Sequence, residues 1–225
     1  MKKLVTGGGV IILIIISSCK HDMVAPGTNV NLVYINNNID SVCFQNDVLP
    51  LFQSYCGSSG CHNASSRTED VILTDYFDIM RGVRANNPSG SKYFNKIGHG
   101  MPPGNYPQMS STQIILIEKW INQSATNTIC NNICDTSNYT FSGSIQSIIS
   151  TNCLGCHGTS PGLGNVYLGD YTSIKNYISS NQQTFFNSIN YSTSIAASLR
   201  MPPVEQLSNC QIKEITKWIN NSFPQ

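Results

Sequence analysis

The stretch Cys153-Leu154-Gly155-Cys156-His157 decides the fold, because it spaces two thiols three positions apart and places an imidazole directly after the second. An earlier stretch, Cys56-Gly57-Ser58-Ser59-Gly60-Cys61-His62, ends in the same Cys-His pair but has four residues between its cysteines. All four are Gly or Ser, which loop out and adopt positive φ at little steric cost. Two such motifs in one chain indicate an internal repeat.

Further matching segments recur in the same order in both halves of the chain, at offsets that drift by only a few residues. They define a tandem duplication of a unit of roughly 85 to 90 residues. The matches are Leu73-Thr74-Asp75-Tyr76 with Leu168-Gly169-Asp170-Tyr171, Ile79 with Ile174, Tyr93-Phe94-Asn95 with Phe185-Phe186-Asn187, Met101-Pro102-Pro103 with Met201-Pro202-Pro203, and Lys119-Trp120-Ile121-Asn122 with Lys217-Trp218-Ile219-Asn220.

Each unit is predicted to be mainly helical, because apolar residues recur at helical spacing before each Cys-His motif and after each Met-Pro-Pro. Ser110 or Ser111, and Ser208 or Asn209, are the expected N-caps of the closing helices. Two tryptophans and two methionines are expected in the cores: Trp120, Trp218, Met80 and Met109. The apolar stripes are Val48, Leu51 and Phe52; Ile145, Ile148 and Ile149; Ile114, Ile117 and Ile121; and Ile212, Ile215 and Ile219.

The N-terminus has the features of an export signal. Lys2 and Lys3 precede an unbroken apolar run over 10–16, which is too short for a stable transmembrane helix. Ile16-Ser17-Ser18-Cys19 resembles the bacterial lipobox, which implies that Cys19 becomes a lipidated first residue. An ordinary cleaved signal that happens to contain a cysteine is the alternative. The lipid would hold the chain on a membrane of the cell envelope, facing the periplasm or the cell surface, without spanning it.

These features divide the chain into five segments. They are the signal at 1–18, a flexible tether at 19–42, a first domain at 43–123, a linker at 124–138 and a second domain at 139–225.

The composition limits the classes of partner. The chain has a net charge of +1 and only 11% charged residues, well under the ~25% that is typical of soluble domains. Since it has no basic stripe, no nucleic-acid partner is expected. Nine cysteines is a high count for 225 residues, and export permits disulfides.

The pattern Cys-x-x-Cys-His is the c-type haem attachment sequence. Two thiols add to the haem vinyl groups as thioethers and the next residue delivers an imidazole to the iron, so Cys153, Cys156 and His157 are predicted to hold one haem c. A redox-active cysteine pair with an incidental histidine is the alternative.

The first motif predicts a second haem c, held by Cys56, Cys61 and His62. Its longer spacing departs from the pattern. The alternative is that Cys56 and Cys61 form disulfides and that this unit has lost its haem.

Each unit also supplies one methionine at a matching place, Met101 and Met201, which we predict to be the second axial ligands of the iron. Ligation by His and Met raises the potential of the iron and leaves no open coordination position. The prolines that follow stiffen the loop. His99 is a rival to Met101, but its counterpart in the second unit is Leu199, which cannot bind iron, so repeat symmetry favours the methionine.

With these motifs in this order, both units resemble class I cytochrome c domains over roughly 43–123 and 139–221. The Leu-x-Asp-Tyr and Met-Pro-Pro elements are similar to those of small haem domains in exported proteins of Bacteroidetes type. The resemblance implies a mainly α fold of two tandem helical domains, each around one covalently bound haem c. Extended cysteine spacings occur among bacterial c-type cytochromes, which makes the first motif compatible with the family.

The resemblance also bears on the four remaining cysteines, which permit three pairings. Because terminal helices pack together in cytochrome c domains, it implies disulfides between Cys43 and Cys130 and between Cys134 and Cys210.

Together these features predict an electron carrier that exchanges electrons with donor and acceptor proteins, rather than an enzyme. A dihaem oxidoreductase of the peroxidase or thiosulfate dehydrogenase type is one alternative, and it needs an open coordination position with acid–base residues nearby. A haem-binding subunit of a larger respiratory complex is the other.

Overall fold

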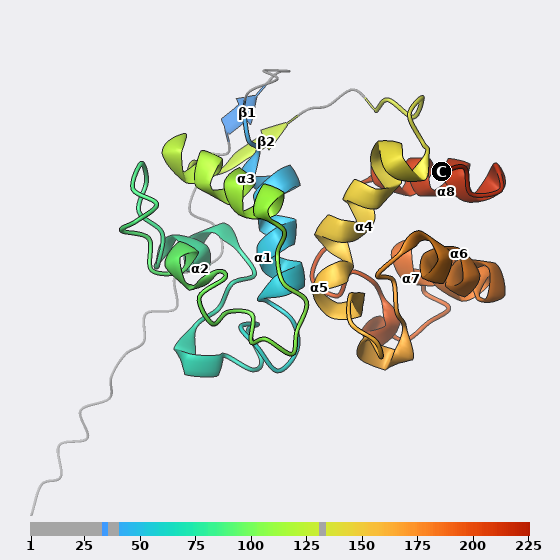
Figure 1. Ribbon diagram of the computed structural model, residues 1–225, viewed down its shortest axis with the longest axis horizontal. Coiled ribbons are helices and arrows are strands. Elements are labelled where there is room, and N and C mark those ends of the chain that lie inside the picture. Colours follow the sequence, from blue (N-terminus) through green and yellow to red (C-terminus); the bar gives the residue numbers. More distant parts are fainter. Residues whose placement is uncertain (1–32, 36–40, 131–133) are drawn as a thin grey trace, which may run out of the picture. The chain divides into compact units, whose positions relative to one another are not determined.

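The computed structural model of the chain describes residues 33–35, 41–130 and 134–225 (Figure 1). These residues are mainly α-helical, as the apolar spacing predicts. The predicted signal, Cys19 and most of the predicted tether lie outside the described residues. Within the described part of the chain, no helix has the length and apolarity to cross a membrane.

The first repeat, residues 41–130, opens with one continuous helical segment that ends at the first Cys-His motif. A short helix follows the motif, and a long helix closes the repeat. The elements are the π-helical turn η1 (Phe44–Val48), α1 (Leu49–Tyr55), the 3₁₀ turn η2 (Thr68–Asp70), α2 (Tyr76–Met80), the 3₁₀ turn η3 (Phe94–Lys96) and α3 (Ser111–Asn122).

The second repeat, residues 134–225, opens and closes in the same way and has longer helices and two additional elements in between. Its elements are the π-helical turn η4 (Phe141–Ile145), α4 (Gln146–Asn152), α5 (Leu154–His157), the 3₁₀ turn η5 (Leu163–Asn165), α6 (Tyr171–Ser180), α7 (Gln182–Ile189), the 3₁₀ turn η6 (Ala197–Leu199) and α8 (Asn209–Asn220).

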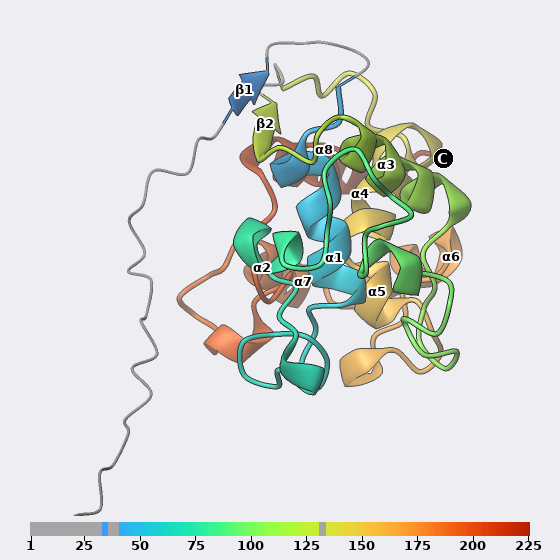
Figure 2. The ribbon, with the colours of Figure 1, turned by 90° about the vertical axis from the view of Figure 1, so that its left-hand side faces the viewer.

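Each repeat has its own hydrophobic core, in which the closing helix packs on the opening one. In both repeats the closing helix contacts the first helical turn, α3 against η1 and α8 against η4 (Figure 1 and Figure 2). The rings of Phe44 and Trp120 lie 5.0 Å apart between centroids, and those of Phe141 and Trp218 lie 6.0 Å apart. The prediction that both tryptophans are core residues is confirmed.

The two methionines expected in the core differ in burial. Met109 is buried in the core of the first repeat, whereas Met80 is half-buried at its edge. Both cores belong to one compact unit that contains every described residue. The mainly α fold is confirmed by the order of elements, which are nearly all helical. An arrangement of two separate haem domains stays a prediction.

The closing helices begin where the sequence predicts. Ser110 and Ser208 are the N-caps, and each forms a capping box with the glutamine three residues on, Gln113 and Gln211 respectively. In such a box the serine oxygen accepts a backbone N–H of the first turn, and the glutamine side chain accepts the N–H of the cap residue. Each cap stabilises its helix by about 1 kcal/mol.

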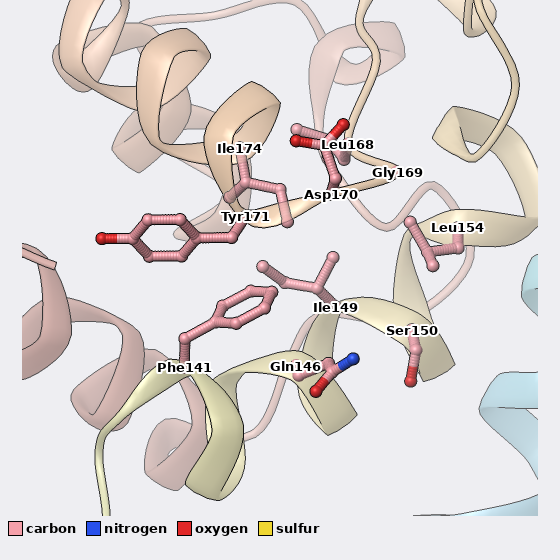
Figure 3. Close-up of a pocket in the computed structure, with 10 residues that line it drawn as sticks. All are labelled: Phe141, Gln146, Ile149, Ser150, Leu154, Leu168, Gly169, Asp170, Tyr171 and Ile174. Atoms are coloured by element: carbon pink, nitrogen blue, oxygen red, sulfur yellow. The ribbon is translucent and has the colours of Figure 1, made fainter. Parts of the chain in front are cut away.

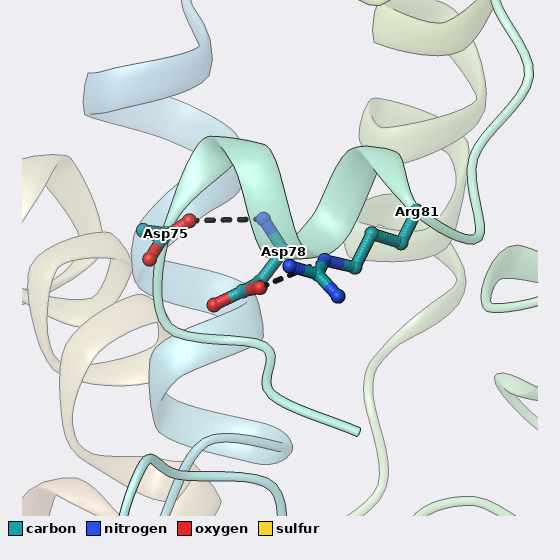
Figure 4. Close-up of polar contacts among 3 residues, drawn as sticks. All are labelled: Asp75, Asp78 and Arg81. Carbon is teal, nitrogen blue, oxygen red and sulfur yellow. Dashed lines mark hydrogen bonds and ion pairs between the residues drawn. The ribbon is translucent and has the colours of Figure 1, made fainter. Parts of the chain in front are cut away.

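The repeated aspartate of the Leu-x-Asp-Tyr element caps the next helix in both repeats. Asp75 accepts the backbone N–H of Asp78 at 2.9 Å, and Asp170 accepts that of Ser173 at 2.9 Å. In the first repeat the Asp78 carboxylate also lies 3.1 Å from the Arg81 guanidinium (Figure 4). Because the Arg81 side chain is exposed, this ion pair contributes at most about 1 kcal/mol to the free energy of unfolding.

The repeated tyrosine of the same element ties the middle of each repeat to its end. Tyr76 donates its hydroxyl to the carbonyl of Ala125 at 3.0 Å, and Tyr171 donates to the carbonyl of Phe223 at 2.6 Å. Both acceptors lie just beyond the closing helix, in the same left-handed backbone conformation. The recurrence of Asp and Tyr in the sequence therefore has a structural cause in both repeats.

The predicted tether and linker are not entirely featureless. Strand β1 (Val33–Ile35) pairs in parallel with strand β2 (Thr128–Cys130). The hydroxyl of Thr128 accepts the N–H of Phe44 at 2.8 Å, and Asn127 is buried as well. Three-residue strands are too short to show a period-2 pattern, so the sequence analysis placed both segments outside the fold.

Both disulfides that the resemblance implies are present. Cys43 pairs with Cys130 and Cys134 with Cys210, with Cα atoms 5.7 and 5.4 Å apart. The first bridge joins the start of the opening helix to β2, and the second joins the chain before η4 to α8. Each disulfide therefore connects the two ends of one repeat.

Candidate haem sites

The four cysteines of the two Cys-His motifs keep free thiols. Among the described residues these are Cys56, Cys61, Cys153 and Cys156, whereas the other four cysteines form the two disulfides. The alternative in which Cys56 and Cys61 form disulfides is therefore not what the structure contains. The donors that two haem groups need for attachment are present as thiols in both repeats.

Burial sets the reactivity of these thiols. It raises the pKa of Cys56 and of Cys153 to about 12, and the neighbouring thiol of each motif adds to the shift. Burial also raises the pKa of Cys156. A redox-active Cys-x-x-Cys pair needs a thiol with a lowered pKa. The direction of these shifts counts against the redox alternative for the second motif.

The histidine of each motif makes the same hydrogen bond. Nδ1 of His62 lies 3.0 Å from the carbonyl oxygen of Thr68, and Nδ1 of His157 lies 3.0 Å from that of Val166. A carbonyl only accepts, so in both rings Nδ1 carries the proton and donates it. In the neutral ring Nε2 then carries the lone pair, which is the arrangement that a metal-binding histidine uses.

The second histidine is held in the neutral form. Burial lowers the pKa of His157, while the carbonyls of Val166 and Leu163 oppose the shift. A neutral imidazole is the form that binds iron.

The backbone of the two motifs closes in the same way despite the different lengths. The N–H of His62 donates to the carbonyl of Cys56 at 3.0 Å, and that of His157 donates to Cys153 at 2.9 Å. The additional length of the first motif is on the outside, where Ser59 is exposed and the next residue, a glycine, has φ +84°. The Gly/Ser insert therefore changes the loop without changing how the histidine is attached to it.

The repeated leucine of the Leu-x-Asp-Tyr element also contacts the motif. The N–H groups of Leu73 and Leu168 donate to the carbonyls of His62 and His157, both at 2.8 Å. Both leucines are buried in the cores. Each histidine is thus held at its ring and at its backbone carbonyl by the segment that follows it.

The two predicted methionine ligands follow loops of different length. In both repeats the backbone N–H of the methionine closes the loop with a hydrogen bond to the helical turn before it. The N–H of Met101 donates to the carbonyl of Lys96, and the N–H of Met201 donates to that of Ser188, both at 3.1 Å. The loops between donor and acceptor span 97–100 and 189–200.

The methionine side chains differ in exposure. Met101 is 38% exposed, whereas Met201 is half-buried. The rival ligand His99 is exposed on the shorter loop. Ligation of one iron by each His/Met pair stays a prediction.

A cavity of about 270 Å³ lies in the second repeat, between its opening helix and the start of α6 (Figure 3). Its walls contain no cysteine, histidine or methionine, but one wall residue, Leu154, lies between the two motif cysteines. Ile149 is one wall residue, and its counterpart in the first repeat is the fully buried Phe52. The lining residues are Phe141, Gln146, Ile149, Ser150, Leu154, Leu168, Gly169, Asp170, Tyr171 and Ile174.

The carbonyl partners of the two histidines were not predicted from the sequence. Thr68 and Val166 act through their backbone oxygens, and a backbone acceptor leaves no residue-type signal in a sequence. The only hint is their position, six and nine residues after the histidine.

No cluster of three or more His, Cys, Asp or Glu side chains that could hold a metal ion occurs within the described ranges. A haem needs fewer protein ligands than a free metal ion, because its porphyrin supplies the other ligands of the iron. No family model matches the chain, and no curated protein or solved structure is significantly similar to it.

Proposed function

We propose that the chain is an exported, lipid-anchored dihaem c-type cytochrome that carries electrons between partner proteins. The observation that carries the proposal is the recurrence of one arrangement in both repeats. The motif thiols are free, and the histidine that follows them donates Nδ1–H to a backbone carbonyl at 3.0 Å. That hydrogen bond orients the ring and raises the basicity of the ligand nitrogen.

The residues of each repeat have distinct tasks in this function. The thiols of Cys56 and Cys61, and of Cys153 and Cys156, form the thioethers that prevent loss of the cofactor outside the cytoplasm. A bound haem c supplies the one-electron couple of its iron. Nε2 of the motif histidine would hold the iron of that haem.

The methionine loops complete each site in the proposal. The sulfur of Met101 or Met201 would also hold the iron, which would raise the potential of the iron and exclude exogenous ligands. One backbone hydrogen bond connects each methionine to the preceding helical turn, at 3.1 Å in both repeats. Because the chain has few charges, long-range steering contributes little to partner docking.

A second candidate function, a dihaem oxidoreductase, is favoured by one observation. The 38% exposure of Met101 makes it the more easily displaced ligand. Its displacement would open a coordination position in the first repeat. Carbon monoxide binding to the reduced protein separates the two functions: rapid binding at one haem supports the oxidoreductase, and slow or absent binding supports the carrier.

The proposal is tested by the intact mass and the haem content of the mature chain. Two covalent haems per chain are expected. The double variant Cys56→Ala/Cys61→Ala should lose the first haem alone, and Cys153→Ala/Cys156→Ala the second alone. A wild-type chain without covalent haem overturns the proposal, and a chain with one haem restricts it to the repeat that carries the haem.

Membrane attachment is tested separately. The variant Cys19→Ala should move the protein from the membrane fraction to the soluble fraction and leave the haem content unchanged. Retention in the membrane fraction would show that the anchor is not a lipid on this residue.

A further inference from the structure

The two residues that the Cys-x-x-Cys-His pattern leaves free, Leu154 and Gly155, are used to contact the other repeat. Helix α1 of the first repeat packs against α4 and α5 of the second. The N–H of Gly155 donates to the hydroxyl of Ser54 at 3.2 Å. Leu154 packs against the hydrophobic cores of both repeats. The second attachment turn is therefore part of the surface between the repeats.

The first attachment motif lies next to this contact in the chain. The sulfur of Cys156 lies 3.6 Å from the backbone carbonyl oxygen of Ser54, and Ser54 precedes Cys56 by two residues. A single non-bonded contact therefore connects a thioether-forming sulfur of one site to the peptide backbone that leads directly into the other site.

Close approach at this point requires glycine at position 155. A Cβ atom built there would lie 2.1 Å from the carbonyl oxygen of Ser54 and 2.3 Å from its carbon. Both are backbone atoms, which cannot move without shifting α1. The contact therefore depends on the absence of a side chain at this position.

Two more hydrogen bonds hold the same surface together. The hydroxyl of Tyr55 donates to the carbonyl of Ser150 at 3.0 Å, and the side-chain amide of Gln113 donates to the same carbonyl at 3.3 Å. Tyr55 is buried. The end of α1 and the start of α3 thus bind the C-terminal part of α4, immediately before the second motif.

We propose that Ser54, Leu154 and Gly155 are positioning residues that hold the two haem attachment turns against each other, so that an electron passes from one haem site to the other inside the chain. This inference rests on the proposed function. In the transfer one iron loses an electron and the other gains it, and no bond forms or breaks and no proton moves. Thioether formation removes the thiol proton of Cys156, so the 3.6 Å approach to Ser54 remains as a packing contact.

The main test is Gly155→Ala in the haem-loaded, full-length chain. Haem attachment does not use the residues between the cysteines, so the haem content should be unchanged. The added methyl group should separate the turns and abolish most of the bisignate Soret circular dichroism that two coupled haems produce. The separation between the two midpoint potentials should narrow as well, because Coulomb repulsion between the sites falls with distance. If both the Soret signal and the separation between the potentials stay unchanged, the proposal is overturned.

Gly104→Ala is the matched control. Gly104 directly follows Met101-Pro102-Pro103, and a Cβ atom there meets nothing within 4 Å. The same chemical change at this position should leave the Soret signal and the potentials unchanged. Ser54→Ala/Tyr55→Phe removes three hydrogen bonds without adding bulk, and it should weaken the Soret signal less than Gly155→Ala does.

A cross-link separates failure of this inference from failure of the proposed function. In the full chain produced without haem, Ser54→Cys combined with Cys56→Ala, Cys61→Ala and Cys153→Ala should be joined at position 54 to Cys156 by a short bifunctional thiol reagent. Ser89→Cys, at an exposed position of the same repeat, is the control and should not be joined to Cys156. No cross-link from position 54 would overturn the juxtaposition, whatever the haem content. A cross-link in a protein whose wild type binds no haem would leave the juxtaposition standing and remove its role in electron transfer.

Discussion

The two repeats differ in the lengths of their loops and agree in the hydrogen bonds that the loops close. The attachment loop is longer by two residues in the first repeat, and the loop before the methionine is longer in the second, 189–200 against 97–100. In both repeats the histidine N–H still donates to the first motif cysteine, and the methionine N–H donates to the preceding helical turn. The retained bonds fix the predicted ligands, while the loops between them vary. Positions at the loop ends are therefore better indicators of function than loop length.

A second difference concerns packing. The first repeat fills the space beside its opening helix with Phe52, which is 1% exposed, whereas the second repeat has Ile149 there and a cavity of about 270 Å³. The two cores thus differ by one aromatic ring at this position. Changes at predicted ligands and changes in the cores should consequently have separable effects.

The largest effect is expected at the methionine ligands. Met201→Ala and Met101→Ala should each lower the potential of one haem by on the order of 0.1–0.3 V, within the ~0.8 V range that axial ligands span, and should let carbon monoxide bind to the reduced haem. Potentiometric titration and carbon monoxide difference spectra measure both changes. Met80→Leu, at the half-buried edge of the first core, is the control and should leave both values unchanged. If only one of the two alanine variants shifts a potential, the repeats do not share one ligand set.

The next largest effect is expected in the cores. Trp120→Ala and Trp218→Ala should each lower the free energy of unfolding by about 3–5 kcal/mol, because each opens a cavity and removes a buried aromatic ring. Each also removes an indole N–H that donates to a carbonyl at 2.9 Å, of Thr126 or of Pro224. Urea unfolding followed by far-ultraviolet circular dichroism measures the loss.

The matched control for the tryptophan variants is Ile115→Ala, at a residue of α3 that is 60% exposed. It should change the unfolding free energy by less than about 0.5 kcal/mol. A loss of that small size at either tryptophan would show that the two cores are not equivalent.

The disulfides should contribute almost equally to stability. They close sequence separations of 87 and 76 residues, so the loop-entropy contributions differ by only about 0.1 kcal/mol. The double variants Cys43→Ala/Cys130→Ala and Cys134→Ala/Cys210→Ala should each cost about 2–5 kcal/mol in the same unfolding measurement. A larger loss of unfolding free energy in the Cys43/Cys130 variant would show that side-chain packing also contributes, because Cys43 is fully buried and Cys210 is not. Equal losses would assign the effect to chain entropy.

The sequence predicted the helices and their caps well, because those features are local. The spacing of apolar residues and the serines at 110 and 208 depend only on neighbours within one or two helical turns. The pairing of β1 with β2 was missed, since it joins three-residue segments about 95 residues apart and such pairing is decided by contacts far along the chain.

The haem sites stay a prediction, and only part of their local structure is visible in the sequence. The thiols and histidines are visible as residue types at a defined spacing, and the repeat doubles the signal. The carbonyl partners of the histidines and the contact of Ser54 with Gly155 were missed. Carbonyl groups occur at every residue, and a glycine that fits against another backbone looks in a sequence like any loop glycine.

The smallest expected effect tests the packing difference directly. Ile149→Phe places in the second repeat the ring that Phe52 supplies in the first, and the cavity lined by Ile149 offers about 270 Å³ to receive it. Filling an internal cavity commonly stabilises a domain by about 0.5–2 kcal/mol, so the urea midpoint should rise while the haem content and the potentials stay unchanged. The neighbouring core residue Ile148 does not line the cavity, and Ile148→Phe should instead cost about 1–3 kcal/mol by overpacking. If Ile149→Phe also destabilises the protein, the space is not equivalent to that of the Phe52 ring, and the opening helices of the two repeats pack differently.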